Sequence, residues 1–202
     1  MLCLKVPTDP SWAPAALAAI ETMLIDHAHC ELKAASNAMS LIARHPDDGV
    51  IVKALIELAK DELQHFERVV TFLAGRGLSL RTPEVDTYAA ELRKSAGRLP
   101  RDQEVNSLVD RLLVAAVIEA RSCERFKLLL DHWTIDDDAL RAFYQELFAC
   151  EAKHYRVLCD LALYASGGRA SKVEARLAAL VACEGQIVTA IANNGSRATV
   201  HG

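Results

Sequence analysis

Hydrophobic residues recur every three or four positions along most of the chain, with polar residues between them. This period is typical of amphipathic α-helices that bury one face, and no strand is predicted. Prolines, glycines and capping residues divide the pattern into four long helices, at about residues 14–45, 48–77, 102–133 and 137–167. An early break in the first helix is compatible with the pattern. A fifth helix is predicted over residues 171–193, packed on the outside of the others.

The connection between the second and third helices, residues 76–101, is much longer than the other connections. Thr82 and Pro83 predict a short helix inside it, because threonine is a good N-cap and proline suits the first helical turn. A chain of 202 residues, 51% of them hydrophobic, can bury one sizeable core. We therefore expect one domain over residues 1–195 and a disordered tail over residues 196–202.

Six ionisable residues interrupt the apolar faces of the four long helices. Each half of the chain carries a Glu-x-x-His pair and, 31 or 32 positions before it, a lone Glu. The six residues are Glu31, Glu62, His65, Glu119, Glu151 and His154. The halves align at an offset of 88 or 89, which predicts that each is the same two-helix hairpin. Two hairpins joined by a long central crossover are typical of an all-α, ferritin-like four-helix bundle, here with an extra C-terminal helix.

The spacing of these residues suits metal binding. Residues three positions apart share one face of a helix, so each Glu-x-x-His pair can hold one ion. With Glu31 and Glu119 as bridging or terminal ligands, four carboxylates and two neutral imidazoles would balance two divalent cations, which we expect roughly 3.5 to 4 Å apart. The same carboxylates would be costly to bury without metal. Hard oxygen ligands with imidazoles favour iron or manganese over zinc or a cluster, and iron is the metal we expect.

A simpler interpretation is that the motifs lie on solvated helix faces, where a single Glu-x-x-His pair is common. The neighbours of the six residues argue against it. Glu62 and His65 share their face with Leu58 and Phe66, and apolar residues surround the other four in the same way. A solvated charge would stand on the opposite face, so the pattern indicates a buried two-metal site.

Composition narrows the class of protein further. No apolar stretch approaches the length of a membrane span, and the N-terminus lacks the layout of a signal peptide, so we expect a cytoplasmic protein. The six cysteines form no C-x-x-C pair, which argues against a zinc module and against a secreted disulfide framework. The sequence contains no phosphate-cradling Gly-rich loop.

Three segments, His27–Ser36, Asp61–Glu67 and Ile118–Phe126, resemble those of bacterial tRNA hydroxylases that act on 2-methylthio-isopentenyl-adenosine. The resemblance spans most of the chain. It implies a non-haem di-iron monooxygenase that inserts one oxygen atom of O₂ into the isopentenyl group of the modified adenosine beside the anticodon, with electrons from an external donor. It also implies that the six residues of the repeated motif are the metal ligands. It does not identify the donor, the tRNAs or the residues that contact them.

Two other classes of function stay open at this point. A ferritin-like ferroxidase or a peroxide-reducing di-iron protein could use the same six ligands without any RNA. A metal-free interaction bundle is the second alternative, and it would require the six residues to be hydrated or paired with one another. Metal analysis separates this bundle from the other two classes.

The charge of the chain gives modest support for RNA binding. With 23 basic and 27 acidic residues the net charge is −4, which by itself argues against a nucleic-acid protein. Residues 76–101, however, hold six basic residues against three acidic ones. This segment therefore carries +3 and the rest of the chain −7, so the crossover is a candidate phosphate-binding surface. An ordinary solvated loop remains an equal alternative.

Two finer expectations concern the surroundings of the ligands. A ligating histidine usually donates its second ring N–H to a carboxylate or carbonyl, and Asp61 is placed to accept from His154. The repeat breaks there, because Cys150 occupies the equivalent position in the second half and is a poor acceptor, so His65 would need another partner. Alanines cluster around the two lone Glu residues and predict either a substrate channel or closely packed helices. They are Ala28, Ala34, Ala35, Ala38, Ala115, Ala116 and Ala120.

Overall fold

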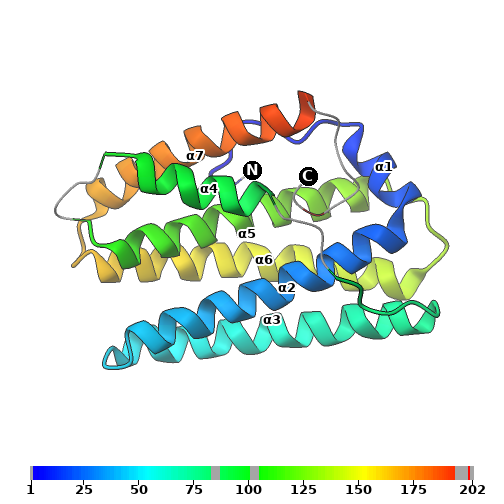
Figure 1. Ribbon diagram of the computed structural model, residues 1–202, viewed down its shortest axis with the longest axis horizontal. Helices are drawn as coiled ribbons and strands as arrows, with labels where there is room; N and C mark the ends of the chain where they lie inside the picture. Colours follow the sequence, from blue (N-terminus) through cyan, green and yellow to red (C-terminus); the bar gives the residue numbers. More distant parts are fainter. Residues whose placement is uncertain (1, 83–86, 101–104, 194–199, 201–202) are drawn as a thin grey trace.

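The computed structural model describes residues 2–82, 87–100, 105–193 and 200, and within these ranges it contains seven α-helices and no strand. Figure 1 shows the helices running mostly along one long axis. Their bounds are α1 Trp12–Ala18, α2 Ile20–Arg44, α3 Gly49–Gly75, α4 Thr87–Arg98, α5 Ser107–Asp131, α6 Asp138–Ala165 and α7 Ala170–Asn193. The prediction of an all-α protein is confirmed.

Capping side chains set where three of the long helices begin. Asp48 accepts hydrogen bonds from the backbone N–H groups of Val50 and Ile51 at the start of α3. Asn106 and Asp137 do the same at the starts of α5 and α6. Since each cap satisfies backbone donors that have no partner inside the helix, the chain enters the helix at these points. α5 therefore begins after Asn106, later than the expected start near residue 102.

The break allowed for in the first helix is real, because Ala19 leaves the helical conformation, with φ −117° and ψ 39°, between α1 and α2. The crossover also contains the expected short helix, α4. Its expected start at Pro83 lies outside the described residues, and the described helix begins at Thr87. In the tail that we expected to be disordered, the structure describes Val200 alone. This residue is buried and its N–H donates to Asp26 at 2.7 Å.

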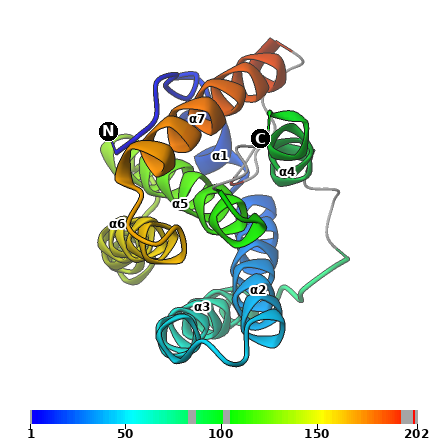
Figure 2. The ribbon, with the colours of Figure 1, turned by 90° about the vertical axis from the view of Figure 1, so that its left-hand side faces the viewer.

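The four long helices form two antiparallel hairpins, α2 with α3 and α5 with α6, which lie side by side (Figure 2). Buried hydrophobic residues form two clusters along this bundle. One contains Leu41 and Ile51, which flank the α2–α3 turn, and the other contains Leu24 and Leu73 at the far end of the same hairpin. The six residues of the repeated motif lie between the two clusters, at the middle of their helices.

α7 covers α5 and packs against α4, as expected for an outer helix. It is the one described helix whose length and composition would suit a membrane span. Its buried residues nevertheless include Arg176, which forms a salt bridge with Asp110 on α5, and Glu184. Gly185 lets the N-terminal segment cross α7 closely, since a Cβ there would lie 2.7 Å from Val6 Cγ2. These contacts show that α7 packs against the rest of the bundle.

A buried ionic network joins α5 to α7 and to the N-terminal segment. Arg121 donates to Glu124 and, at 2.7 Å, to Glu184 on α7. Glu124 in turn accepts from the backbone N–H of Thr8 at 2.8 Å. The side chains of Arg121 and Glu184 are fully buried. The expected set of functional residues did not include this network, because the sequence pattern alone does not show that α5 is covered on its outer face.

Candidate metal centre

The fold brings all six residues of the repeated motif together. Each of the four long helices contributes to the site, and every one of the six residues is at most 7% exposed. α2 and α5 supply one Glu each, while α3 and α6 supply one Glu-x-x-His pair each. The two halves of the repeat therefore contribute equivalent side chains to the site.

The ligand atoms form two overlapping groups, in each of which all atoms lie within 4.8 Å of one another. The first group is Glu31, Glu62, His65 and Glu151, and the second is Glu62, Glu119, Glu151 and His154. Two carboxylates, those of Glu62 and Glu151, belong to both groups. This geometry favours them as the shared ligands of two ions, with Glu31 and Glu119 as the terminal ones.

Several ligand atoms have no hydrogen bond within the described part of the chain, although they are buried. They are Glu31 Oε2, Glu62 Oε1, His65 Nδ1 and His154 Nδ1. His154 Nδ1 lies 2.8 Å from Glu62 Oε1, and His65 Nδ1 lies 3.3 Å from Glu31 Oε2, without hydrogen-bonding geometry. Buried polar atoms are normally satisfied, so lone pairs converging on one space fit a bound cation. The donor set of carboxylates and imidazoles suits iron.

The six side chains together form a cage, and the pKa values of its residues also fit a bound cation. Burial, together with the negative charges of Glu119 and Glu31, raises the pKa of Glu62 to about 8. Burial and Glu119 likewise raise the pKa of Glu151 well above its usual value. Burial lowers the pKa of His154, but its contacts with Cys150 and with the carboxylate of Glu62 outweigh burial and raise the pKa to about 11. Without a cation the cage must therefore hold protons, which metal ions would displace.

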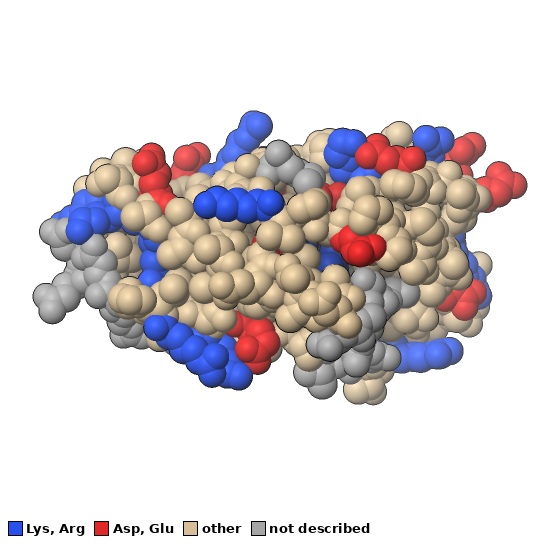
Figure 3. All heavy atoms as spheres, turned by 90° about the horizontal axis from the view of Figure 1, so that it is seen from above, with Lys and Arg blue, Asp and Glu red and all other residues tan. Residues whose placement is uncertain are grey.

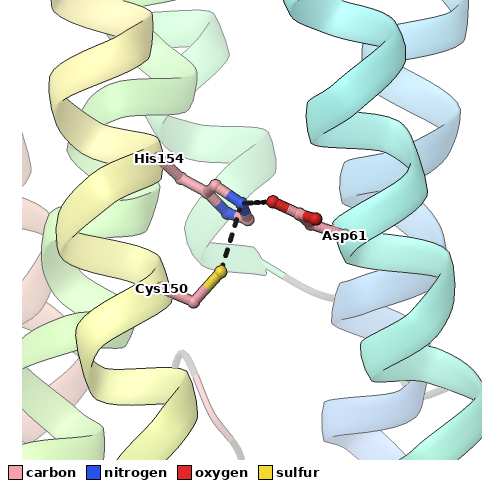
Figure 4. Close-up of side chains that lie close together, drawn as sticks. All are labelled: Asp61, Cys150 and His154. Atoms are coloured by element: carbon pink, nitrogen blue, oxygen red, sulfur yellow. Dashed lines mark hydrogen bonds and ion pairs between the residues drawn. The ribbon is translucent and has the colours of Figure 1, made fainter.

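Asp61 on α3 reaches the His154 ring on α6, as expected (Figure 4). Its Oδ2 lies 3.3 Å from His154 Nε2, the ring nitrogen that faces away from the cage. The Cys150 thiol lies 3.4 Å from the same nitrogen. Burial lowers the pKa of His65, but contacts with Cys150 and with the cage carboxylates outweigh burial and raise this pKa to about 12. The thiol that we judged a poor acceptor thus stands next to both imidazoles.

One buried histidine beside the cage, His27, was not among the predicted site residues. His27 Nε2 lies 2.6 Å from Glu31 Oε1, and its Nδ1 lies 3.0 Å from the Tyr144 hydroxyl. The position of His27 one helical turn before Glu31 is visible in the sequence. The contact with Tyr144 on α6, 117 positions away, depends on how the two hairpins pack together.

A pocket of about 360 Å³ lies between α2, α4 and α5 and reaches Glu119. Three of the seven alanines named above, Ala34, Ala38 and Ala115, line it. The other four are not among its lining residues, so a substrate channel along this pocket would include only three of the seven alanines. Leu55, Leu58, Val114 and Ile118 add apolar walls.

Basic residues also line this pocket. They are Lys33, Arg93 and Arg111, and Arg93 belongs to the crossover segment. Elsewhere in this segment, Lys94 pairs with Glu91 at 3.0 Å and Arg76 pairs with Asp137, while residue 101 lies outside the described ranges. On the face shown in Figure 3, basic side chains alternate with acidic ones rather than forming one continuous patch.

The bundle of two paired hairpins, with its buried cage of carboxylates and imidazoles, places the chain among the ferritin-like proteins. In the solved structures, a chain described as Protein 43 with aldehyde deformylating oxygenase activity, from Synechococcus, has a TM-score of 0.84 and 34% identity, over 100% of this chain and 96% of that one. The model of the family described as tRNA-(MS[2]IO[6]A)-hydroxylase (MiaE) matches residues 1–198, and the chain belongs to this family.

Two curated relatives carry the same description, tRNA 2-(methylsulfanyl)-N(6)-isopentenyladenosine(37) hydroxylase. The protein from Pseudomonas putida is 45% identical over 159 residues, which are 79% of this chain and 74% of that protein. The protein from Salmonella typhimurium is 29% identical, with the same shares covered. The expectation of a tRNA hydroxylase family, drawn from three sequence segments, is confirmed.

Proposed function

We propose that this protein is a non-haem di-iron monooxygenase that uses O₂ to hydroxylate the isopentenyl group of 2-methylthio-isopentenyl-adenosine in tRNA, beside the anticodon. The observation that carries this proposal is the junction of the pocket and the cage at Glu119. A substrate group held in the pocket would meet the metal ligands at this carboxylate. Membership of the hydroxylase family supports the choice of substrate.

The six cage residues would hold two iron ions, and iron bound there would pass electrons from a donor to O₂. Hydroxylation places one oxygen atom into a C–H bond and the other into water, so it consumes two electrons from an external donor and two protons from solvent. The protein would therefore have an electron-transfer partner in addition to tRNA.

The chain's own contribution to the reaction is positioning and the exclusion of water. The apolar walls of the pocket, including Leu58 and Ile118, are chemically suited to a prenyl chain. The charged side chains of Arg93 and Arg111 suit the phosphates and the polar nucleoside that follow the prenyl group. This division of the pocket orients the isopentenyl end toward Glu119.

The direct test is an assay of the iron-loaded protein with a chemical reductant, O₂ and tRNA that carries the isopentenyl modification. The expected product is a nucleoside that has gained one oxygen atom, detected by mass spectrometry. His65→Ala and His154→Ala should lose iron and turnover while remaining folded. His132→Ala, at an exposed histidine outside the site, is the matched control.

A ferroxidase or peroxide-reducing protein is the alternative. It would consume Fe(II) and O₂ or peroxide without modifying tRNA, so the same samples distinguish the two functions. A long-chain aldehyde and a short-chain aldehyde should also be assayed, because the name of the Synechococcus protein includes aldehyde deformylating oxygenase activity. The basic residues of the pocket favour tRNA over an uncharged chain.

We propose a cytoplasmic location, since the substrate is tRNA, and one domain over residues 1–195. The contacts of α7 with α4 and α5 support the proposal of a single domain.

A further inference from the structure

The two halves of the cage differ in what holds their terminal carboxylates. In the internal repeat, Glu31 aligns with Glu119 at an offset of 88, and the same offset places Ala115 opposite His27. Glu31 therefore has a histidine one turn before it, where Glu119 has an alanine that lines the pocket. The two halves of the repeat therefore match at the ligand positions and differ at the position one turn before the lone Glu.

His27 is held rigidly. Its side chain is fully buried, and the rings of Phe126 and Tyr144 lie 5.1 and 5.5 Å from its own ring. Since Glu31 is a carboxylate, His27 must donate to it from Nε2, and the neutral tautomer that does so accepts at Nδ1 from the Tyr144 hydroxyl. Tyr144 thus selects the tautomer that His27 needs to hold Glu31.

This contact determines how Glu31 can act as a ligand. Its Oε1 is occupied by His27 at 2.6 Å, while its Oε2 faces the cage near His65 and has no hydrogen bond. One oxygen is thereby reserved for a metal ion, and the carboxylate is fixed in orientation. Burial would raise the pKa of Glu31, but the hydrogen bond with His27 outweighs it, so the pKa is lowered.

Glu119 has a different environment. It lines the pocket, and Ala115, which stands where His27 stands in the first half, has no side-chain group that could donate to it. The interaction that it makes is with Glu151, another cage carboxylate. Glu119 can therefore change its orientation as a substrate enters, whereas Glu31 is fixed.

We propose that His27, oriented by Tyr144, is a positioning residue that fixes Glu31 as a one-oxygen ligand and makes the two metal positions unequal, so that the position of Glu119 and His154 is the one that faces the substrate. This inference rests on the proposed two-metal function. It assigns a role to a histidine that is not a ligand of either ion.

The test is an anaerobic Fe(II) titration of the metal-free protein, combined with Mössbauer spectra of the ⁵⁷Fe-loaded form. The wild type should bind two ions in distinct environments. His27→Leu should weaken the binding of one ion about 10- to 100-fold and leave the other within about 3-fold, as expected when a partner of a ligand is lost. Tyr144→Phe should have a smaller effect on the same ion, and His27→Gln, which keeps a donor, should restore part of the affinity.

Phe143→Leu is the matched control, because it removes a buried ring near His27, 6.1 Å between centroids, without touching Glu31. Equal losses in Phe143→Leu and His27→Leu would show a merely structural role and overturn the inference. Unchanged affinity for both ions in His27→Leu would also overturn the inference. If His27→Leu does not fold, unchanged affinity for both ions in Tyr144→Phe and His27→Gln would overturn it instead. A wild-type protein that binds no pair of ions would instead refute the proposed function itself.

Discussion

Asp61 on α3 and His154 on α6 meet across the two hairpins, with 3.3 Å between Oδ2 and Nε2 (Figure 4). The contact ties the first half of the repeat to a ligand of the second half. His154 can therefore keep Nδ1 toward the cage while its other nitrogen donates outward. The exposed Lys153 also contacts Asp61, at 3.2 Å.

Asp61→Ala should weaken binding of the ion at His154 about 10-fold or more, because the imidazole loses the acceptor that sets its tautomer and orientation. The Fe(II) titration measures this loss. Lys153→Ala removes the other partner of Asp61 and should leave both affinities unchanged. Equal affinities in wild type and Asp61→Ala would contradict the prediction.

The metal-free protein should lose stability as the pH rises from about 6 to 9. Glu62, with a pKa near 8, and His65 and His154, with pKa values near 12 and 11, hold protons in the folded state. In the unfolded chain the glutamate has lost its proton below this range and the histidines lose theirs at about pH 6.5, so a rising pH favours unfolding. Cys150, whose pKa is lowered to about 7, acts in the opposite direction, but it is one group against three.

Thermal unfolding of the chelator-treated protein across this pH range measures the effect, and the iron-loaded protein under anaerobic conditions is the comparison. The loaded form should depend less on pH, since metal ions have already displaced the protons. A metal-free midpoint that stays constant or rises with pH would speak against a cage that holds protons.

Ala115→Leu should reduce hydroxylation of tRNA at least about 10-fold while the protein keeps its iron. The larger side chain would fill the pocket beside Glu119, whereas Ala115 itself is not a ligand. Product formation and iron content are the two measurements. Ala142→Leu, at an exposed position on α6, is the control. Full turnover in Ala115→Leu would move substrate entry to another face.

Neutralising Arg93, Lys94, Arg98 and Arg101 together should weaken tRNA binding and reduce its dependence on salt, because phosphate contacts release counterions. Iron content and the reaction of reduced iron with O₂ should stay unchanged. Titration of tRNA at two salt concentrations measures the effect. Unchanged affinity would leave the basic segment as a solvated surface and place the tRNA elsewhere.

Arg121→Leu should lower the free energy of unfolding by about 3 to 5 kcal/mol, since it removes the guanidinium that pairs directly with the buried carboxylates of Glu124 and Glu184. Denaturant unfolding measures this loss. Lys127→Ala removes an exposed pair with Asp131 and should cost less than about 1 kcal/mol. A loss in Arg121→Leu no larger than in Lys127→Ala would show that the network contributes little.

The sequence alone determined the helices, the bundle and the six cage residues. A Glu three positions before a His lies on the same helix face whatever the tertiary structure, and the repeat at an offset of 88 or 89 shows that two such faces must meet. The pairing of Asp61 with His154 could also be expected, because residues next to a ligand point toward the neighbouring helix.

The tertiary structure decided which carboxylates are shared, which alanines line a pocket and which buried residues support the cage. These properties depend on atoms from helices far apart in the sequence. Glu62 and Glu151 reach both groups because their helices face each other, and His27 holds Glu31 because Tyr144 comes from α6. Helical periodicity fixes which face of a helix is buried, but the contacts of that face depend on how the helices pack.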